Sequence, residues 1–272
     1  MRVELGTVAA RLQPALRAVG YCTAAAMDEE TARALNRLNL AFYREHAQEF
    51  SRTRAQPWPG WERLLGWLPT GPQRVLDVGC GNARFARFLA SHHPDAGYVG
   101  VDASEPLLAE ARERLPSTLA AELQCADFVV EPPAQALPPG PFSLVVLFGV
   151  LHGVPGAARR RALVEASAAR LSRGGILALT AWRFAELPDL HRRIVPWPGP
   201  STPDPHRIDP ARVDPGDHLI AWGGEGALRY AHALDASELV QLTAGLPLVP
   251  VAGYLDDGRD RQRNRYAVYR AH

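Results

Sequence analysis

Short apolar runs and helical patterns alternate through the middle of the chain. The apolar runs have the length and the β-branched composition of strands, at residues 74–78, 98–102, 119–126, 142–148 and 175–181. Apolar residues at helical spacing lie between them, over 83–91, 106–115 and 157–171. Such alternation is typical of βαβ units, so we expect an α/β fold with a mostly parallel sheet over residues 71–183.

The two ends of the chain follow other patterns. Apolar positions recur near helical spacing from 29 to 68, and Pro57-Trp58-Pro59 divides them into two helices, so residues 27–70 are predicted to form an N-terminal helical cap. Residues 1–26 show little periodicity and are expected to be a dispensable or disordered extension. Residues 229–272 are predicted to hold a helix at 237–244 and an antiparallel hairpin with strands at 249–254 and 265–269.

Prolines dominate the segment before this hairpin. Eight of the chain's 24 prolines lie between residues 187 and 215. Because proline fixes its own φ and lacks an N–H donor, this stretch is expected to be neither helix nor central strand. We therefore predict an extended loop over 184–228, of a length that usually has a function such as holding a substrate.

Charge and cysteine content exclude several classes of protein. The 30 basic side chains are all arginine and are balanced by 29 acidic ones, so there is no strong global field toward nucleic acid, and no lysine can form a Schiff base. Cys22, Cys80 and Cys125 are widely spaced and odd in number, which favours a reducing, cytoplasmic compartment over disulfides or a metal site. No apolar run approaches the ~20 residues of a membrane span.

A glycine-rich turn follows the first predicted strand. Asp77-Val78-Gly79-Cys80-Gly81-Asn82 joins that strand to a helix, and its glycines let the backbone approach a ligand at the carboxyl edge of the sheet. The dinucleotide fingerprint requires a further small residue where this chain has Arg84, which argues against NAD and FAD. Cys80 is expected to be a small packing residue of the turn.

Acidic residues end the next two strands. Asp102 comes 21 positions after Gly81 and is placed to accept hydrogen bonds from both hydroxyls of a ribose. Asp127 could accept from an adenine amino group, and Asp77 could face a cationic amino-acid end. Asp102 could instead only cap the following helix.

These residues resemble the class I S-adenosylmethionine-dependent methyltransferases, whose motifs look like Asp77 to Gly81, Asp102 and Asp127. The resemblance covers residues 71–183 and implies a doubly wound, seven-stranded, mostly parallel sheet whose last strand is antiparallel. It also implies S-adenosyl-L-methionine as the cofactor. The residues expected to bind the cofactor are Asp77, Gly79, Cys80, Gly81, Asn82, Asp102, Ala103, Asp127, Phe128 and Phe148.

A narrower resemblance spans most of the chain. The tRNA wobble-uridine carboxymethyl methyltransferase family has similar motifs, which here read Phe42-Tyr43, Phe50-Ser51-Arg52-Thr53-Arg54, Val150-Leu151-His152, Thr180-Ala181-Trp182, Arg229-Tyr230-Ala231-His232 and Gly253-Tyr254. This resemblance implies esterification of a carboxymethyl group on tRNA, and a small zinc-binding activator protein as a partner. The chain departs from the family pattern at Gly153, Ala231 and Arg265.

Arginine suits a carboxylate acceptor. A carboxylate is ionised at neutral pH and needs alignment rather than a general base, and a guanidinium can hold it with two hydrogen bonds. We therefore expect Arg54 and Arg229 to act in catalysis by holding the carboxylate. His152, which follows the fourth predicted strand, is expected to act there as a hydrogen-bond donor to the substrate. Substrate contacts are expected from Arg52, Trp182, Tyr230 and His232.

Other interpretations remain open for these side chains and for the whole chain. The arginines could form surface salt bridges, His152 could begin a helix, and Trp182 could be a wall of the core. Basic residues at 159–161, 170, 173, 259, 261, 263 and 265 could contact phosphates or form a solvated face. The alternatives to a tRNA enzyme are a methyltransferase acting on a small-molecule metabolite and a non-catalytic, cofactor-binding assembly factor.

Overall fold

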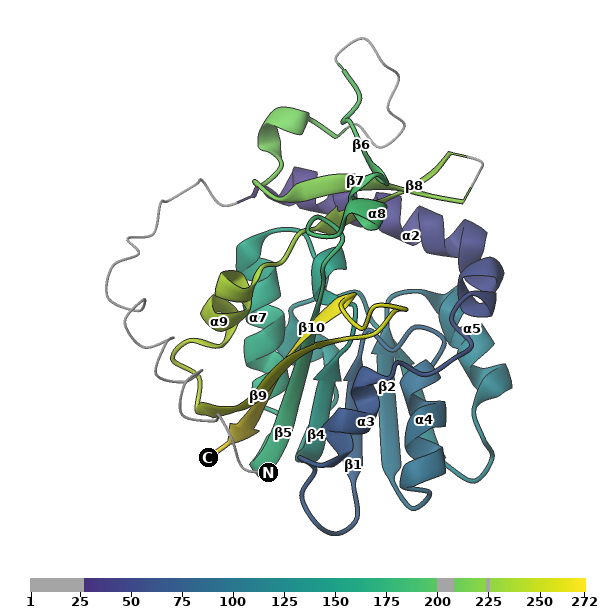
Figure 1. Ribbon diagram of the computed structural model, residues 1–272, viewed down its shortest axis with the longest axis vertical. Coiled ribbons are helices and arrows are strands. Elements are labelled where there is room, and N and C mark those ends of the chain that lie inside the picture. Colours follow the sequence, from purple (N-terminus) through teal and green to yellow (C-terminus); the bar gives the residue numbers. More distant parts are fainter. Residues whose placement is uncertain (1–26, 200–207, 224–225) are drawn as a thin grey trace.

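A seven-stranded sheet forms the centre of the molecule. The computed structural model describes residues 27–199, 208–223 and 226–272, so the predicted extension 1–26 lies outside the described residues. The strand order is β3-β2-β1-β4-β5-β10-β9, and β10 runs antiparallel to both of its neighbours (Figure 1). The strands are β1 (Arg74–Val78), β2 (Gly97–Asp102), β3 (Ala120–Cys125), β4 (Phe142–Leu147), β5 (Leu171–Trp182), β9 (Leu248–Asp256) and β10 (Asn264–Ala271). The predicted doubly wound sheet with an antiparallel terminal hairpin is confirmed.

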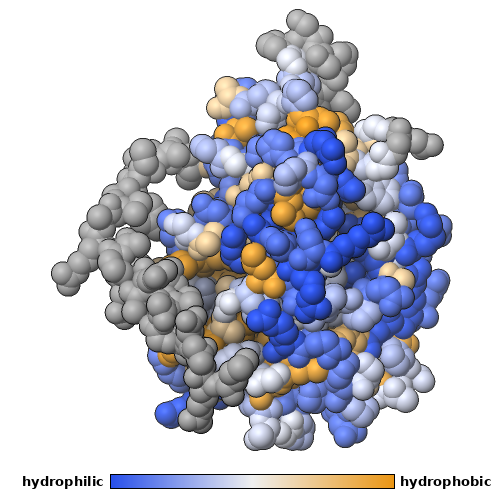
Figure 2. All heavy atoms as spheres, viewed as in Figure 1, coloured by the Kyte–Doolittle hydropathy of each residue, from blue (hydrophilic) through white to orange (hydrophobic). Residues whose placement is uncertain are grey.

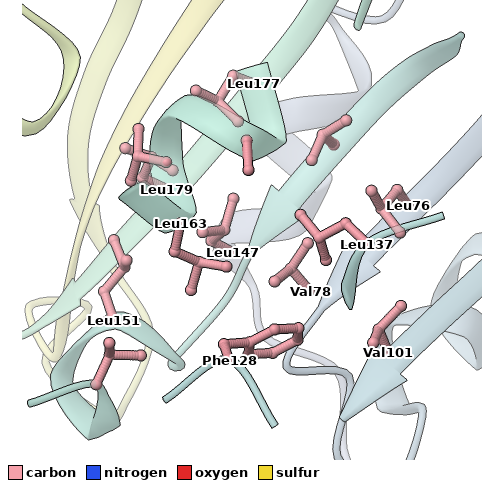
Figure 3. Packing of buried hydrophobic residues seen from close by; sticks show 14 of the residues in the cluster. Leu76, Val78, Val101, Phe128, Leu137, Leu147, Leu151, Leu163, Leu177 and Leu179 are labelled. Carbon is pink, nitrogen blue, oxygen red and sulfur yellow. The ribbon is translucent and has the colours of Figure 1, made fainter. Parts of the chain in front are cut away.

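Helices cover both faces of this sheet. One face packs against α3 (Gly60–Leu65), α4 (Arg84–His92) and α5 (Glu105–Arg114). The other packs against α6 (Pro133–Ala136), α7 (Ala157–Ala168) and α9 (Ala236–Thr243). Figure 3 shows side chains of β1, β2, β4 and β5 meeting Leu163 of α7 in the second layer. Because both faces are covered, the central strands are apolar on both sides, which explains their continuous hydrophobic runs.

Local sequence signals set the helix ends. α5 begins after Ser104, whose side chain accepts a hydrogen bond from the N–H of Leu107, and Pro106 lies in its first turn. Glu105 opens the helix and Arg114 closes it, which suits the helix dipole. α2 (Glu29–Arg52) begins in the same way after Asp28. These caps lie at the sites where the sequence predicts helix starts.

A second, smaller sheet lies above the first and was not predicted. It contains β6 (Ile194–Val195), β7 (Asp217–Trp222) and β8 (Ala227–His232), all antiparallel. The interpretation of 184–228 as one extended loop was therefore wrong for its described part, which also contains α8 (Pro188–His191) and η3 (Pro210–Arg212). The eight prolines all precede β7, and neither β7 nor β8 contains one, so the proline content of the segment does not exclude these two strands.

The two predicted N-terminal helices occupy different places. α2 lies beside the small sheet, above the carboxyl ends of the central strands (Figure 1). Its apolar face packs against β7, β8 and the segment after β3 through Met27, Ala32, Ala34, Leu35, Leu38, Val129, Leu219 and Tyr230. α3 instead lies on the main sheet, where Trp61 is buried. Of these two helices, α2 is the one that, together with the small sheet, covers the carboxyl ends of the central strands.

The face of the molecule drawn in Figure 2 is mainly hydrophilic. Figure 2 shows hydrophobic residues on one face as small separate groups within a hydrophilic surface. Within the described ranges, no helix combines the length and the apolar character needed to cross a bilayer.

Candidate active site

A cavity of about 1070 Å³ lies between the main sheet and the cover formed by α2 and the small sheet. It opens at the carboxyl ends of β1, β2 and β4, where the strand order reverses and ligands bind in open α/β sheets. All ten residues expected to bind the cofactor line it. So do Arg54, His152, Trp182, Arg229 and Tyr230 among those expected to act on the substrate.

The glycine turn forms the floor of this cavity. Gly79 has φ +75°, and a Cβ there would lie 2.5 Å from the Cβ of Val150. Gly81 also has positive φ, at +53°. The N–H groups of Gly79 and Cys80 both donate to the carbonyl of Val101, at 2.7 and 3.1 Å, which pins the turn to β2. Only glycine fits the first position, because it combines a positive φ with close contact to Val150, and the turn that it makes lines the cavity.

Asp102 ends β2 at the wall of the cavity. Its carboxylate accepts hydrogen bonds from the N–H groups of Gly81 and Ser104, each at 2.8 Å. Burial raises the pKa of Asp102, and these two backbone donors oppose the shift. Two carboxylate oxygens offer about four acceptor sites, so the residue can hold the turn and still accept from a ligand.

Asp77 is buried beneath the turn. The hydroxyl of Tyr98 donates to its carboxylate at 2.7 Å. Burial is the main cause that raises the pKa of Asp77 to about 7, and the nearby charge of Asp102 adds to it. A nearby cation would stabilise the ionised form of this buried carboxyl group.

α2 contributes to the same half of the cavity. The Nδ2 group of Asn36 donates to Asp127 at 2.6 Å, and the N–H of Val129 donates to the other carboxylate oxygen at 2.9 Å. Asn82 lies across the cavity, and its buried Nδ2 group has no hydrogen-bond partner among the described residues. An unpaired buried donor in the floor of a cavity is suited to a polar ligand.

Two arginines lie in the other half of the cavity. Arg229, on β8, is only 5% exposed, and its buried Nε has no hydrogen-bond partner. Its guanidinium carbon lies 4.9 Å from the centre of the Trp182 ring, and Nη1 donates to the hydroxyl of Tyr43 at 3.4 Å. Arg54 lies over the ring of Phe50, at 3.5 Å.

The two guanidinium groups repel each other. Burial, followed by the charge of Arg229, lowers the pKa of Arg54 to about 9. Within the part of the chain that the structure describes, neither arginine forms an ion pair with a carboxylate. Two partly desolvated cations without a counter-ion make this half of the cavity a site for an anion.

His152 lies between the two halves, in the short helix η2 (Leu151–Gly153). Its ring centre is 5.4 Å from that of Trp182, and its buried Nδ1 has no hydrogen-bond partner. Burial, together with the charges of Arg229 and Arg54, lowers the pKa of His152 to about 3. The imidazole is therefore neutral at physiological pH and is a weak base.

Three of the residues expected to contact the substrate do not offer a free polar group to the cavity. Arg52 is exposed, lies near Glu49 and does not line the cavity. His232 does not line it either, because the ring is buried between Asp217 and Glu238, with N to O distances of 2.6 and 2.9 Å. Tyr230 lines the cavity, but its hydroxyl donates to Asp217 at 2.8 Å.

Several arginines proposed as phosphate contacts have partners within the protein. Their carboxylate partners all belong to this chain, in the pairs Arg159–Glu29, Arg160–Glu238, Arg161–Glu165, Arg261–Asp256, Arg263–Asp189 and Arg265–Glu186. The guanidinium of Arg170 instead donates to backbone carbonyls. These groups are occupied in the fold, which leaves fewer free charges for a nucleic acid.

Comparison with known proteins identifies the central region. Residues 76–177 match the family model described as "Methyltransferase domain". This region is therefore similar to a methyltransferase domain, and its sheet has the class I methyltransferase fold. Among solved structures of the same fold are a SAM-dependent methyltransferase from Methanosarcina mazei (TM-score 0.58, 18% identity, 79% of this chain and 98% of that one) and the N-methyltransferase NodS from Bradyrhizobium japonicum in complex with S-adenosyl-L-homocysteine (0.51, 18%, 89% and 98%). The predicted fold is confirmed, and the match to a methyltransferase domain and the S-adenosyl-L-homocysteine bound to NodS agree with the predicted cofactor.

Curated relatives that match this region are named as methyltransferases of a small organic acid. "Trans-aconitate 2-methyltransferase" of Methylobacterium nodulans is 32% identical over 142 residues, which are 52% of this chain and 48% of the relative. The protein of the same name from Afipia carboxidovorans is 27% identical over 210 residues, 71% of this chain and 76% of the relative. The chain spans about half the length of the first of these relatives. Their names support the small-molecule alternative better than the tRNA interpretation.

Sequence motifs did not reveal the contribution of α2. Asn36, Asn39 and Tyr43 all line the cavity and come from one face of this helix. Their spacing of i, i+3 and i+7 is itself a signal, because it places polar side chains on one helical stripe beside apolar neighbours. Neither asparagine belongs to a motif, and both were missed.

Proposed function

We propose that this protein transfers the methyl group of S-adenosyl-L-methionine to a carboxylate of a small polycarboxylic acid and releases the methyl ester. The observation that carries this proposal is the pair of Arg54 and Arg229, which have no carboxylate partner within the described ranges and share a cavity with the glycine turn. The trans-aconitate methyltransferases among the relatives support the same class of substrate.

The residues present fit the cofactor. Gly79 leaves backbone where a Cβ would clash, and the unpaired Nδ2 of Asn82 needs an acceptor. Asp102 would hold the ribose hydroxyls, Asp127 the adenine amino group and Asp77 the cationic amino-acid end. The bound cofactor supplies an electrophilic methyl group on a sulfonium.

The acceptor half of the cavity orients an anion. A carboxylate is already ionised, so Arg54 and Arg229 need only bind it, exclude water and aim one oxygen at the methyl group. Neutral His152 offers a hydrogen bond without taking a proton. Esterification removes the negative charge, which weakens the hold of the arginines and favours release of the product.

The size of the cavity favours a small acceptor. About 1070 Å³ is close to the upper range of ligand pockets, roughly 300–1000 Å³, and accommodates a nucleoside cofactor together with a small acid. The net charge of +1 supplies no general attraction to RNA. Both observations favour the metabolite alternative over tRNA.

The proposal is tested by methyl transfer to defined acceptors. Purified protein with methyl-labelled S-adenosylmethionine should label trans-aconitate and other di- or tricarboxylic acids, and should label a monocarboxylic acid of similar size much less. The same assay with total tRNA, including tRNA that carries carboxymethyluridine, tests the tRNA interpretation. Label on tRNA and none on the acids would overturn the proposal. Cofactor binding without transfer to any acceptor would instead indicate an assembly factor.

Cofactor affinity should depend on pH through Asp77. Its carboxyl is half protonated at about pH 7 in the free protein, and a bound cation requires the ionised form. The affinity for S-adenosylhomocysteine should therefore rise with pH up to about 7 and then level off, with a loss of up to about tenfold per unit below it. Calorimetry between pH 5 and 7.5 measures this, and Asp77→Asn, which cannot ionise, should show a flat and weaker profile.

Acceptor affinity should show a different profile. At saturating cofactor, the KM for trans-aconitate should be constant from pH 6 to 8, because neutral His152 does not titrate there. Above pH 9 the KM should rise as Arg54 loses its proton and its attraction for the acid. Steady-state kinetics over pH 6 to 10 give the answer. A rate that rises through pH 6.5 would mean that a histidine acts as a base.

A further inference from the structure

α2 reaches both halves of the cavity with the same type of side chain. Asn36 and Asn39 lie one turn apart and are 8% and 7% exposed. Asn36 donates to Asp127 in the cofactor half. Asn39 faces the acceptor half, where it contacts two other segments of the chain.

The side chain of Asn39 joins the backbone beside Arg229 to the backbone beside His152. Its Oδ1 accepts from the N–H of Tyr230, the residue after Arg229, at 2.9 Å. Its Nδ2 donates to the carbonyl of Gly153, the residue after His152, at 3.3 Å. An amide suits this position because it can accept from one segment and donate to the other.

We propose that Asn39 is a positioning residue, which holds Arg229 and His152 at the separation that the acceptor carboxylate requires. This inference rests on the proposed function, because it assigns Asn39 to the acceptor half of the same site. It predicts that loss of the amide weakens acceptor binding and leaves cofactor binding intact.

A second connection keeps the same two segments together without Asn39. Arg160 of α7 donates from Nη1 to the carbonyl of Val154 at 3.1 Å and from Nε to Glu238 at 2.9 Å, and the other carboxylate oxygen of Glu238 lies 2.9 Å from Nε2 of His232. His232 is on β8 and is held by Asp217 of β7. Removal of the Asn39 amide should therefore shift Arg229 relative to His152 without detaching β8, so the variant is expected to fold.

The experiment compares Asn39→Leu with Asn36→Leu, its matched control on the same helix. Leucine has the same number of side-chain heavy atoms and the same branching at Cγ, and it cannot form the hydrogen bonds. Asn39→Leu should raise the KM for trans-aconitate about tenfold and change the Kd for S-adenosylhomocysteine less than twofold, since a shift of well under ~1 Å in a binding group costs less than the roughly 100-fold loss of a full ~1 Å misplacement. Asn36→Leu should weaken cofactor binding several-fold. Equal effects of both variants on both ligands would overturn the proposal.

A double-mutant cycle tests whether Asn39 acts through Arg229. In an Arg229→Lys background, which keeps a cation and measurable activity, Asn39→Leu should change kcat/KM less than about threefold, because coupled residues are not additive. A full tenfold effect in that background contradicts the proposed role. Asn39→Ala replaces the leucine variant if the latter does not fold.

The same measurements separate this proposal from the proposed function. Wild-type protein that binds S-adenosylhomocysteine but neither binds nor methylates trans-aconitate or a related acid overturns the substrate class. Wild-type activity together with an unchanged KM in Asn39→Leu overturns only the positioning role.

Discussion

Replacement of Arg229 by methionine should lower kcat/KM for the acid about 100-fold, because a buried guanidinium that binds a carboxylate contributes roughly 2–3 kcal/mol. The Kd for S-adenosylhomocysteine should change less than twofold, since Arg229 lies in the acceptor half. The thermal midpoint should stay the same or rise. Arg229 is 5% exposed and forms no ion pair within the described residues, and its removal also relieves the repulsion with Arg54.

A suitable control is Arg52→Met, on the same cover of the cavity. Arg52 is exposed and lies outside the cavity, so its loss should leave both ligands and the rate unchanged. A large loss of stability in Arg229→Met would mean that the arginine serves the fold. An unchanged kcat/KM would mean that the acid binds elsewhere.

Asp102→Ala should weaken cofactor binding at least about 100-fold, because it removes the acceptor for two ribose hydroxyls and releases the turn, and hydrogen bonds to a charged group contribute roughly 1.5–3 kcal/mol each. The N–H groups of Gly81 and Ser104 would lose their partner as well. Calorimetry with S-adenosylhomocysteine measures the loss.

Two further measurements separate the contributions of ligand and turn. Asp102→Asn removes the charge and keeps one acceptor oxygen, which can satisfy only one of the two N–H groups of the turn, so it should be less destabilised than Asp102→Ala and still bind the cofactor weakly. Thermal unfolding without ligand shows how much the turn itself depends on the residue. Retained affinity in Asp102→Ala would show that the ribose lies elsewhere in the cavity.

The main sheet could be predicted because its signals are local. Buried parallel strands need apolar residues on both faces, so residues 142–148 could be recognised as a central strand from composition alone. The turn at Gly79 was equally recognisable, because only glycine tolerates its close approach to Val150. Such features need no knowledge of distant segments.

The small sheet and the surroundings of His232 could not be predicted in this way. The prolines at 188–215, which all precede β7, led to the whole segment being interpreted as a loop, although β7 and β8 after them contain no proline. His232 was expected to contact the substrate because it belongs to the motif Arg229-Tyr230-Ala231-His232, but Asp217 of β7 and Glu238 of α9 enclose its ring. A charge network of this kind exists only after the elements have packed.

The residues of α2 show the same limit. Asn36 acquires its role from Asp127, which is 91 positions away, and Asn39 acquires its role from Gly153 and Tyr230. A polar stripe on a helix predicts that one face is special but does not say what it meets. Only the folded chain shows that this face borders both halves of one cavity.

The most direct test of the central claim is a crystal structure of the protein with S-adenosylhomocysteine and trans-aconitate. The account predicts the ribose at Asp102, the adenine near Asp127, and one carboxylate of the acid bound by Arg54 and Arg229 beside His152. A structure in which the acid lies away from both arginines, or in which the nucleoside does not occupy the cavity above the Gly79 turn, would contradict it.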